Sequence, residues 1–134
     1  MSRDINHLYP ALQPLCREFI TQAAAMDIDV LITCTYRSNA EQNELYAQGR
    51  SKPGLIVTRA RGGQSAHNFT INGKPASKAF DVVPIVNGKP MWNEGHPAWA
   101  KLGEIGESLG LNWYGKPDAR FKEKPHFQLA QEFL

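Results

Sequence analysis

The sequence AFDVVPIV occupies residues 79–86, and apolar, mostly β-branched side chains run through it almost without a break. We expect a buried strand over Phe80–Val86. The pair Asn87-Gly88 follows directly, and Asn-Gly after a strand is typical of a β-hairpin turn. The carboxylate of Asp81 interrupts the apolar run, and a carboxylate inside such a strand has to be paired, hydrogen-bonded or bound to a metal.

Helices are expected before and after this strand. The first has apolar side chains at helical spacing and should end near Met26. The second begins at a capping box, Ser38 to Glu41, and should close at Gly49. The third follows His96-Pro97 and should end at Gly110. The apolar faces of the first and third helices consist of Leu8, Leu12, Leu15 and Phe19, and of Ala98, Leu102, Ile105 and Leu109.

Further strands are expected at Asp29–Tyr36, Leu55–Val57 and His126–Leu129, and a second turn signal lies at Asn72-Gly73. The order is helix, strand, helix, strands, helix, strand. This order predicts an α+β fold, with a small, mostly antiparallel sheet flanked by about three helices.

Length and composition fit one domain over residues 1–134, since domains usually hold ~100–200 residues. Fifteen basic and 13 acidic side chains leave a formal net charge of +2, too small to indicate a nucleic-acid partner. No apolar run approaches the ~20 residues of a spanning helix, so we expect no membrane insertion. Met1–His7 lacks the apolar segment of a signal peptide, and Cys16 and Cys34 are expected to be free thiols.

Three side chains are candidate zinc ligands: His67, Asp81 and His126. Catalytic zinc typically takes three protein ligands and keeps a fourth position open to water. Spacing alone leaves other interpretations open: a surface loop histidine, a strand-end salt bridge and a core histidine. Glu123 lies three residues before His126, with Pro125 between them, so both could face one cleft; a solvated charge is the alternative for Glu123.

The motifs around these residues resemble, in order, the S-x-H, A-x-D and (D/E)-x-x-H motifs of a zinc peptidase superfamily. That superfamily contains the D-Ala-D-Ala carboxypeptidases and the phage L-alanyl-D-glutamate endopeptidases. The matching stretches are SAHNF at 65–69, AFDVVP at 79–84 and EKPHFQ at 123–128. TCTYRS at 33–38, LYAQGR at 45–50 and the region 99–115 are also similar to segments of these enzymes, so the resemblance covers nearly the whole chain.

One segment departs from the family pattern. The spacing between His67 and Asp81 is longer than usual, with residues 70–78 in the middle. The Asn72-Gly73 turn would let these residues leave and return as a hairpin, so we expect a surface excursion outside the metal site.

The resemblance also implies roles for individual residues. His67, Asp81 and His126 would bind one zinc ion per chain, and Glu123 would be the general base. Arg37 would stabilise the oxyanion or hold a substrate carboxylate, with a strand-end ion pair as the alternative. The substrate-binding candidates are Ser65, Trp113 and Tyr114, whose alternatives are a turn residue and core aromatics.

The resemblance implies a fold like that of hedgehog domains and D-Ala-D-Ala peptidases, and the activity of a zinc-dependent endopeptidase of the phage or prophage endolysin type. It would cleave the peptidoglycan stem peptide, with the L-Ala-D-Glu bond favoured. Alternatives are a D-Ala-D-Ala carboxypeptidase or dipeptidase, a non-catalytic zinc-binding module, and a muramidase using carboxylates such as Glu104 and Glu107. Without a signal peptide or separate wall-binding domain, such an enzyme would stay in the host cytoplasm until a holin gives access to the periplasm and wall.

Overall fold

The computed structural model describes residues 1–117, 119 and 122–130. In chain order the elements are η1 (Ile5–His7), α1 (Leu12–Ala25), β1 (Asp29–Cys34), α2 (Asn39–Ala47), η2 (Ala66–Asn68), β2 (Thr70–Ile71), β3 (Lys74–Pro75), β4 (Ala79–Val86), β5 (Lys89–Pro90), α3 (Pro97–Ser108), β6 (Leu111–Trp113) and β7 (His126–Leu129).

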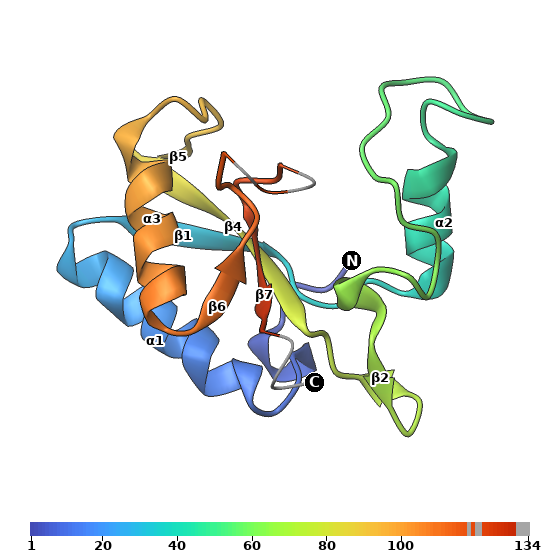
Figure 1. Cartoon of the computed structure of the whole chain (residues 1–134), viewed down its shortest axis with the longest axis horizontal. Coiled ribbons are helices and arrows are strands. Elements are labelled where there is room, and N and C mark those ends of the chain that lie inside the picture. Colours follow the sequence, from blue (N-terminus) through green and yellow to red (C-terminus); the bar gives the residue numbers. More distant parts are fainter. Residues whose placement is uncertain (118, 120–121, 131–134) are drawn as a thin grey trace.

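A five-stranded sheet forms the centre of the fold, in the order β1-β4-β7-β6, with β5 pairing the end of β4. Every pairing in it is antiparallel. Figure 1 shows α1 and α3 side by side against this sheet, whereas α2 stands apart beyond the other end of β1. The predicted α+β class is confirmed. No helix in the described part of the chain is long and apolar enough to cross a bilayer.

The three predicted helices form, with one correction: Leu8, expected on the face of the first helix, lies before α1, where its main chain forms a bridge with Ser77. The Ser38 hydroxyl accepts a hydrogen bond from the Glu41 amide at 3.1 Å, and the Glu41 carboxylate accepts one from the Ser38 amide at 2.9 Å, which completes the capping box of α2. His96 caps α3 by accepting from the amide of Ala98 at 3.1 Å. Gly110 follows α3 with φ +83°, the left-handed conformation that ends helices.

Both Asn-Gly pairs form the predicted hairpin turns. Asn72 and Gly73 have φ values of 51° and 75° between β2 and β3, and Asn87 and Gly88 have 53° and 75° between β4 and β5. Two successive positive φ values identify the type I′ turn, whose twist matches that of the paired strands.

Two expectations from the sequence were wrong. Leu55–Val57 forms no strand: the segment has no pairing partner, and Leu55 is 82% exposed. Gln48 at the end of α2 instead donates to the Leu55 carbonyl at 3.0 Å, which holds the segment as a loop. Strand β1 ends at Cys34 rather than at Tyr36. The short strand β6 was not predicted from the sequence.

Aromatic side chains fill the space between the sheet and the two helices. Phe19 of α1 lies 5.5 Å from Phe80 and 4.8 Å from Phe127, measured between ring centroids. Helix α3 approaches this layer closely because it presents glycines there. A Cβ at Gly106 would lie 2.4 Å from Cδ2 of Phe127, so any larger residue would push the helix away from the sheet.

The register of the three strands β1, β4 and β7 brings three chemically active residues into one row. Asp81 pairs with Cys34 on one side and with His126 on the other. The register of β1 shifts between Ile32, which pairs with core-facing Val82, and Cys34. Such an irregularity re-aims the next side chain, and here it leaves Cys34 opposite Asp81.

Candidate metal centre

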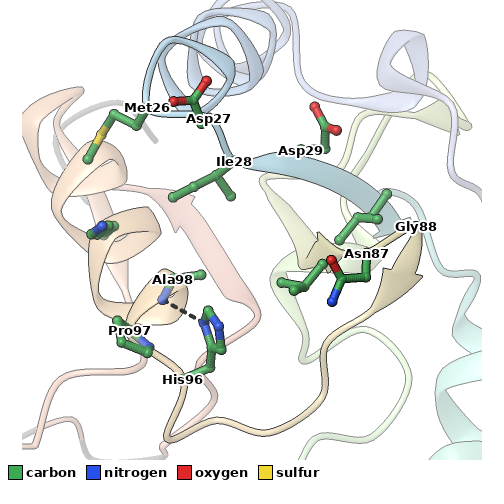
Figure 2. Close-up of a pocket in the computed structure, with 12 residues that line it drawn as sticks. Met26, Asp27, Ile28, Asp29, Asn87, Gly88, His96, Pro97 and Ala98 are labelled. Carbon is green, nitrogen blue, oxygen red and sulfur yellow. Dashed lines mark hydrogen bonds between the residues drawn. The ribbon is translucent and has the colours of Figure 1, made fainter.

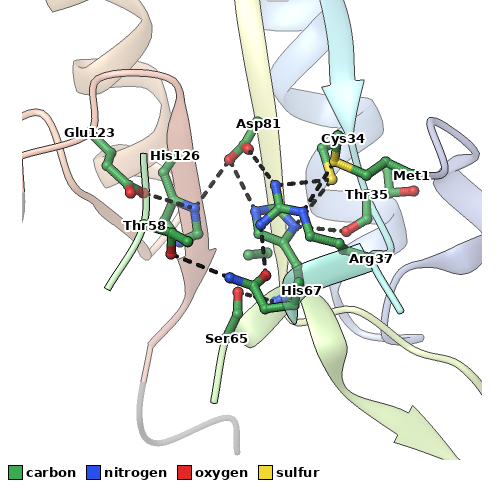
Figure 3. A network of polar contacts seen from close by, with 12 residues as sticks. Met1, Cys34, Thr35, Arg37, Thr58, Ser65, His67, Asp81, Glu123 and His126 are labelled. Carbon is green, nitrogen blue, oxygen red and sulfur yellow. Dashed lines mark hydrogen bonds and ion pairs between the residues drawn. The ribbon is translucent and has the colours of Figure 1, made fainter. Parts of the chain in front are cut away.

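Three donor atoms, one each from His67, Asp81 and His126, converge at the carboxylate of Asp81. Nε2 of His67 lies 3.2 Å from Oδ1 of Asp81, and Nδ1 of His126 lies 3.1 Å from the same oxygen. The two imidazole rings meet edge to face, 5.1 Å apart between centroids. Figure 3 shows the three side chains directed at one another from η2, β4 and β7. The sequence therefore identified three residues that the fold brings into contact across a separation of up to 59 positions.

The second nitrogen of each ring is already engaged. Nδ1 of His67 donates to the main-chain carbonyl of Thr35 at 2.8 Å, and Nε2 of His126 lies 2.9 Å from Oε1 of Gln128. In the neutral imidazoles these bonds leave lone pairs on the nitrogens that face Asp81. Two lone pairs and a carboxylate oxygen then point at one place, an arrangement that repels itself unless a cation lies between them. The donor set and its outer hydrogen bonds fit zinc.

Electrostatics in the cluster favour positive charge. Burial lowers the pKa of His67, but the carboxylate of Asp81 more than reverses this and raises the pKa to about 10. Burial alone would raise the pKa of Asp81, yet the charge of His67 and the contacts with His126 and His67 bring it far below its usual range. The cluster thus holds an ionised carboxylate and attracts a proton or a metal ion to the nitrogens beside it.

The helical turn η2 positions His67. The Ser65 hydroxyl accepts from the His67 amide at 3.2 Å, so Ser65 acts as the cap of this turn, the alternative considered from the sequence. The Arg37 amide donates to the His67 carbonyl at 3.0 Å, and the Asn68 side chain donates to the Arg37 carbonyl at 2.8 Å. These bonds tie η2 to the segment after β1, which fixes the ring of His67 relative to the sheet.

Glu123 lies at the exposed side of the centre. Its Oε2 is 3.7 Å from Nδ1 of His126, the nitrogen that faces Asp81, and its side chain is 46% exposed. The Tyr114 ring lies 4.6 Å from the His126 ring, and the Glu123 amide donates to the Tyr114 carbonyl at 2.9 Å. Burial, followed by the charge of Glu123, raises the pKa of the Tyr114 hydroxyl. Both residues therefore border the donor cluster and remain open to a ligand.

Arg37 lies at the opposite edge of the cluster, in the loop after β1. Its Nη2 is 3.9 Å from Oδ2 of Asp81, and its Nη1 donates to Oε1 of Gln42 at 2.9 Å. Gln42 is fully buried and also donates to the Ala60 carbonyl at 2.8 Å, so it fixes the guanidinium in place. The structure thus gives Arg37 an ion-pair partner and places its charge beside the metal donors.

Cys34 is a further donor that the sequence did not single out. Ligand atoms of Cys34, His67 and Asp81 lie within 4.8 Å of one another. The Cys34 sulfur, however, is 3.7 Å from Nδ1 of His67, the nitrogen that donates to the Thr35 carbonyl. It also lies 3.7 Å from Nη2 of Arg37. The Cys34 sulfur lies at Nδ1 of His67, whereas Nε2 of that ring faces Asp81. We therefore place Cys34 outside the donor set that His126 completes.

Trp113 is not brought to the centre. Its ring stacks on Phe127 at 6.3 Å between centroids, and its Nε1 donates to the Lys124 carbonyl at 2.9 Å. A Cβ at Gly103 would lie 2.3 Å from this ring, so α3 is shaped to receive it. Trp113 is a core aromatic, the alternative given above for this residue. Glu104 and Glu107, the carboxylates considered for a muramidase, are exposed on α3 away from the cluster.

Two of the hollows in the described part of the structure bear on the location of the site. The larger, about 570 Å³, lies between the turn before β1, the end of β4 and the start of α3 (Figure 2). Asp29 and Ile85 pair at that end of β1 and β4, whereas Cys34 and Asp81 pair at the other, so this hollow is remote from the centre. The smaller, about 370 Å³, includes Ser65 and Gln128 and therefore adjoins the centre.

Comparison with known proteins finds relatives that are L-Ala-D-Glu endopeptidases. A curated relative is the peptidoglycan L-alanyl-D-glutamate endopeptidase CwlK of Bacillus subtilis (strain 168), 38% identical over 130 residues that cover 92% of this chain and 74% of that protein. The crystal structure of the Serratia marcescens L-Ala D-Glu endopeptidase ChiX matches with a TM-score of 0.64 at 20% identity, covering 96% of this chain and 85% of that chain, which supports the fold.

The profile of the VanY family, described as D-alanyl-D-alanine carboxypeptidase, matches residues 6–111. This stretch contains Arg37, Ser65, His67 and Asp81 and ends before Glu123 and His126. The match covers most of the chain, and the relative from Bacillus subtilis extends the similarity over 92% of it. The chain therefore belongs to the VanY family of peptidases.

Proposed function

We propose that this protein is a zinc-dependent endopeptidase that cleaves the peptidoglycan stem peptide, with the L-alanyl-D-glutamate bond as its favoured target. The observation that carries the proposal is the shared contact of His67 Nε2 and His126 Nδ1 with Oδ1 of Asp81. The named activity of the relative from Bacillus subtilis supports the choice of bond.

His67, Asp81 and His126 would hold one zinc ion per chain, and peptidases of this family depend on zinc in general. Zinc supplies Lewis-acid polarisation of the scissile carbonyl and makes a water nucleophile more acidic. The bond from Nδ1 of His67 to the Thr35 carbonyl fixes the tautomer, so that Nε2 presents its lone pair. Gln128 performs the same task for His126.

Glu123 is suited to the role of general base. Its carboxylate lies beside the donor cluster, is accessible, and has no position among the three converging atoms. It would take a proton from the attacking water on Oε2 and pass it to the leaving amine. Arg37 brings a fixed guanidinium to the other edge, where it can stabilise negative charge on the carbonyl oxygen.

The test is digestion of purified peptidoglycan followed by identification of the new chain ends. Cleavage at the favoured bond exposes the amino group of D-glutamate. Release of terminal D-alanine would support the carboxypeptidase alternative, and new reducing sugar ends would support a muramidase. Full activity in a sample shown to contain no metal would overturn the zinc mechanism. The matched control is Glu123→Gln, which should bind zinc and leave the peptidoglycan intact.

The endolysin role is a further part of the proposal. It assigns the enzyme to the host cytoplasm, with release to the periplasm and wall through a holin. Its support is the resemblance of the motifs to those of phage endopeptidases. Expression of the chain in a bacterium, alone and with a holin, tests it: lysis only in the presence of the holin is the expected result, and lysis by the chain alone would contradict it.

A further inference from the structure

The hollow that adjoins the metal centre has an unusual charge pattern. It is lined by segments on either side of His67, by Asn39 at the start of α2 and by Gln128 of β7. Among the described residues that line it, Lys78 is the one ionisable side chain, and the others are polar amides, hydroxyls, small residues and Phe69. A hollow of about 370 Å³ whose lining, over the part of the chain that the structure describes, holds one cation and no carboxylate is suited to an anionic group.

The main chain of Lys78 is fixed between the two histidine segments. Its amide donates to the carbonyl of Ala66, the residue before His67, at 3.0 Å. Its carbonyl accepts from the amide of Leu129, three residues after His126, at 3.0 Å. Lys78 therefore cannot move independently of the proposed zinc ligands, which is the rigidity that a binding residue beside a catalytic centre requires.

Aromatic rings hold the side chain of Lys78. Its Nζ lies 3.6 Å from the ring centroid of Phe69 and 5.7 Å from that of Tyr9. A cation over aromatic faces keeps its charge, and its ammonium protons remain available to an acceptor. Within the described residues, no carboxylate pairs with Lys78, in contrast to Lys52, which pairs with Glu44. The ammonium is thus held in place by rings, and none of the residues that the structure describes gives it a carboxylate partner.

The longer spacing between His67 and Asp81 explains how this arrangement arises. The segment 70–78 begins as the exposed hairpin β2–β3, as expected, but it returns through buried Ala76 and Ser77. The Ser77 amide donates to the His7 carbonyl at 2.9 Å. The expected surface excursion therefore holds for β2–β3 but not for Ala76 and Ser77, which are buried, and the last residue of the segment, Lys78, lines the hollow beside the centre.

We propose that Lys78 and the hollow around it form a subsite for a free carboxylate of the stem peptide next to the scissile bond. This inference rests on the proposed function. In a stem peptide the D-glutamate is joined to the following residue through its side-chain carboxyl, so its α-carboxylate is free and lies one residue beyond the bond to be cut. Lys78 is then a specificity-determining residue, because it distinguishes this carboxylate from its uncharged α-amide.

Two matched peptides test the proposal: stem peptides identical except for a free α-carboxylate or an α-amide on the D-glutamate. The wild-type enzyme should prefer the acid. Lys78→Met should lower kcat/KM for the acid about 10- to 100-fold, mainly through KM, because a hydrogen bond between charged groups is lost. The amide should be cleaved by both proteins at rates within about twofold of each other. Lys78→Arg should restore part of the preference, since it keeps the charge.

The matched control is Lys74→Met, on the exposed part of the same hairpin and outside the hollow, which should leave both rates unchanged. Zinc content and melting temperature should be equal in all variants. An equal loss on both peptides would show that Lys78 acts on the fold rather than on the carboxylate, and would overturn the proposal. An active wild-type enzyme without preference for the acid would overturn it too.

Binding separates this proposal from the proposed function. The affinity of zinc-loaded Glu123→Gln for the acid peptide, measured by calorimetry, should fall when Lys78→Met is added. If the wild-type enzyme cleaves neither peptide, the proposed function fails; if affinity does not depend on Lys78 in that background, the subsite fails.

Discussion

The hydrogen bond between Gln128 and His126 gives the sharpest test of the metal centre. His67 is held by a main-chain carbonyl, which no substitution removes, whereas His126 is held by a side chain. Gln128→Leu keeps a similar volume and deletes the acceptor 2.9 Å from Nε2. His126 is only 6% exposed, so solvent cannot fully replace that acceptor. Loss of such an outer partner typically weakens metal binding about 10- to 100-fold, or ~1.4–2.8 kcal/mol.

The assay is competition for zinc between the protein and a chromogenic chelator. We expect Gln128→Leu to release zinc at a chelator concentration that leaves the wild type loaded, and Gln128→Glu to hold it, because a carboxylate also accepts from Nε2. Gln64→Leu is the control, since Gln64 lines the same hollow but accepts from the Arg61 amide and does not contact either histidine. A wild-type affinity in folded Gln128→Leu would refute the assignment of His126 Nδ1 as a ligand.

Three more predictions concern Glu123, Arg37 and the core thiol of Cys16. Glu123→Gln should keep its zinc by elemental analysis and lose ~10²–10⁴-fold in turnover, and loss of zinc would contradict its role as base. Arg37→Ala should fold, bind zinc and hydrolyse ~10²–10³-fold more slowly, with partial recovery in Arg37→Lys; a lower melting temperature with unchanged turnover would make it a structural ion-pair partner. Burial raises the pKa of the Cys16 thiol to about 12, from 9.0 in an unstructured chain. The unfolded state therefore binds fewer protons than the folded state between pH 9 and 12, so stability is full below this window and falls as pH rises through it. Denaturant unfolding of wild type and Cys16→Ala across that window should show a shallower fall in the variant, and parallel curves would contradict the assignment.

The sequence predicted the parts of the fold that local chemistry determines. The capping box at Ser38, the two Asn-Gly turns and the glycine after α3 each specify a backbone geometry through nearby atoms, and all of them are confirmed. Leu55–Val57 shows the limit of this reasoning, because apolar composition alone does not supply a neighbouring strand. A strand requires a partner, and the partner depends on the rest of the fold.

The candidate site could be predicted as a set of residues but not as an arrangement. The three motifs give His67, Asp81 and His126, whereas their contact depends on the pairing of Asp81 with His126 across β4 and β7. The pairing of Cys34 with Asp81 depends on the register shift within β1, which has no local signal. Gln128 was missed as a partner of His126. Residues two apart in a strand face the same side of the sheet, so every strand contains such pairs, and the sequence does not tell which of them forms a hydrogen bond.

The position of β7 in the sheet has a consequence for how activity arises during synthesis. It is the last described strand in the chain, yet it lies between β4 and β6, so without it both neighbours would expose unpaired edges. Pairings of such long sequence separation form late in folding, after the cost of closing the chain has been met. A nascent chain that has already made Arg37, His67 and Asp81 therefore has no complete donor set until His126 has been translated and inserted. A fragment that ends before His126 lacks one of the three proposed zinc ligands and should be inactive, so activity requires the insertion of β7 between β4 and β6.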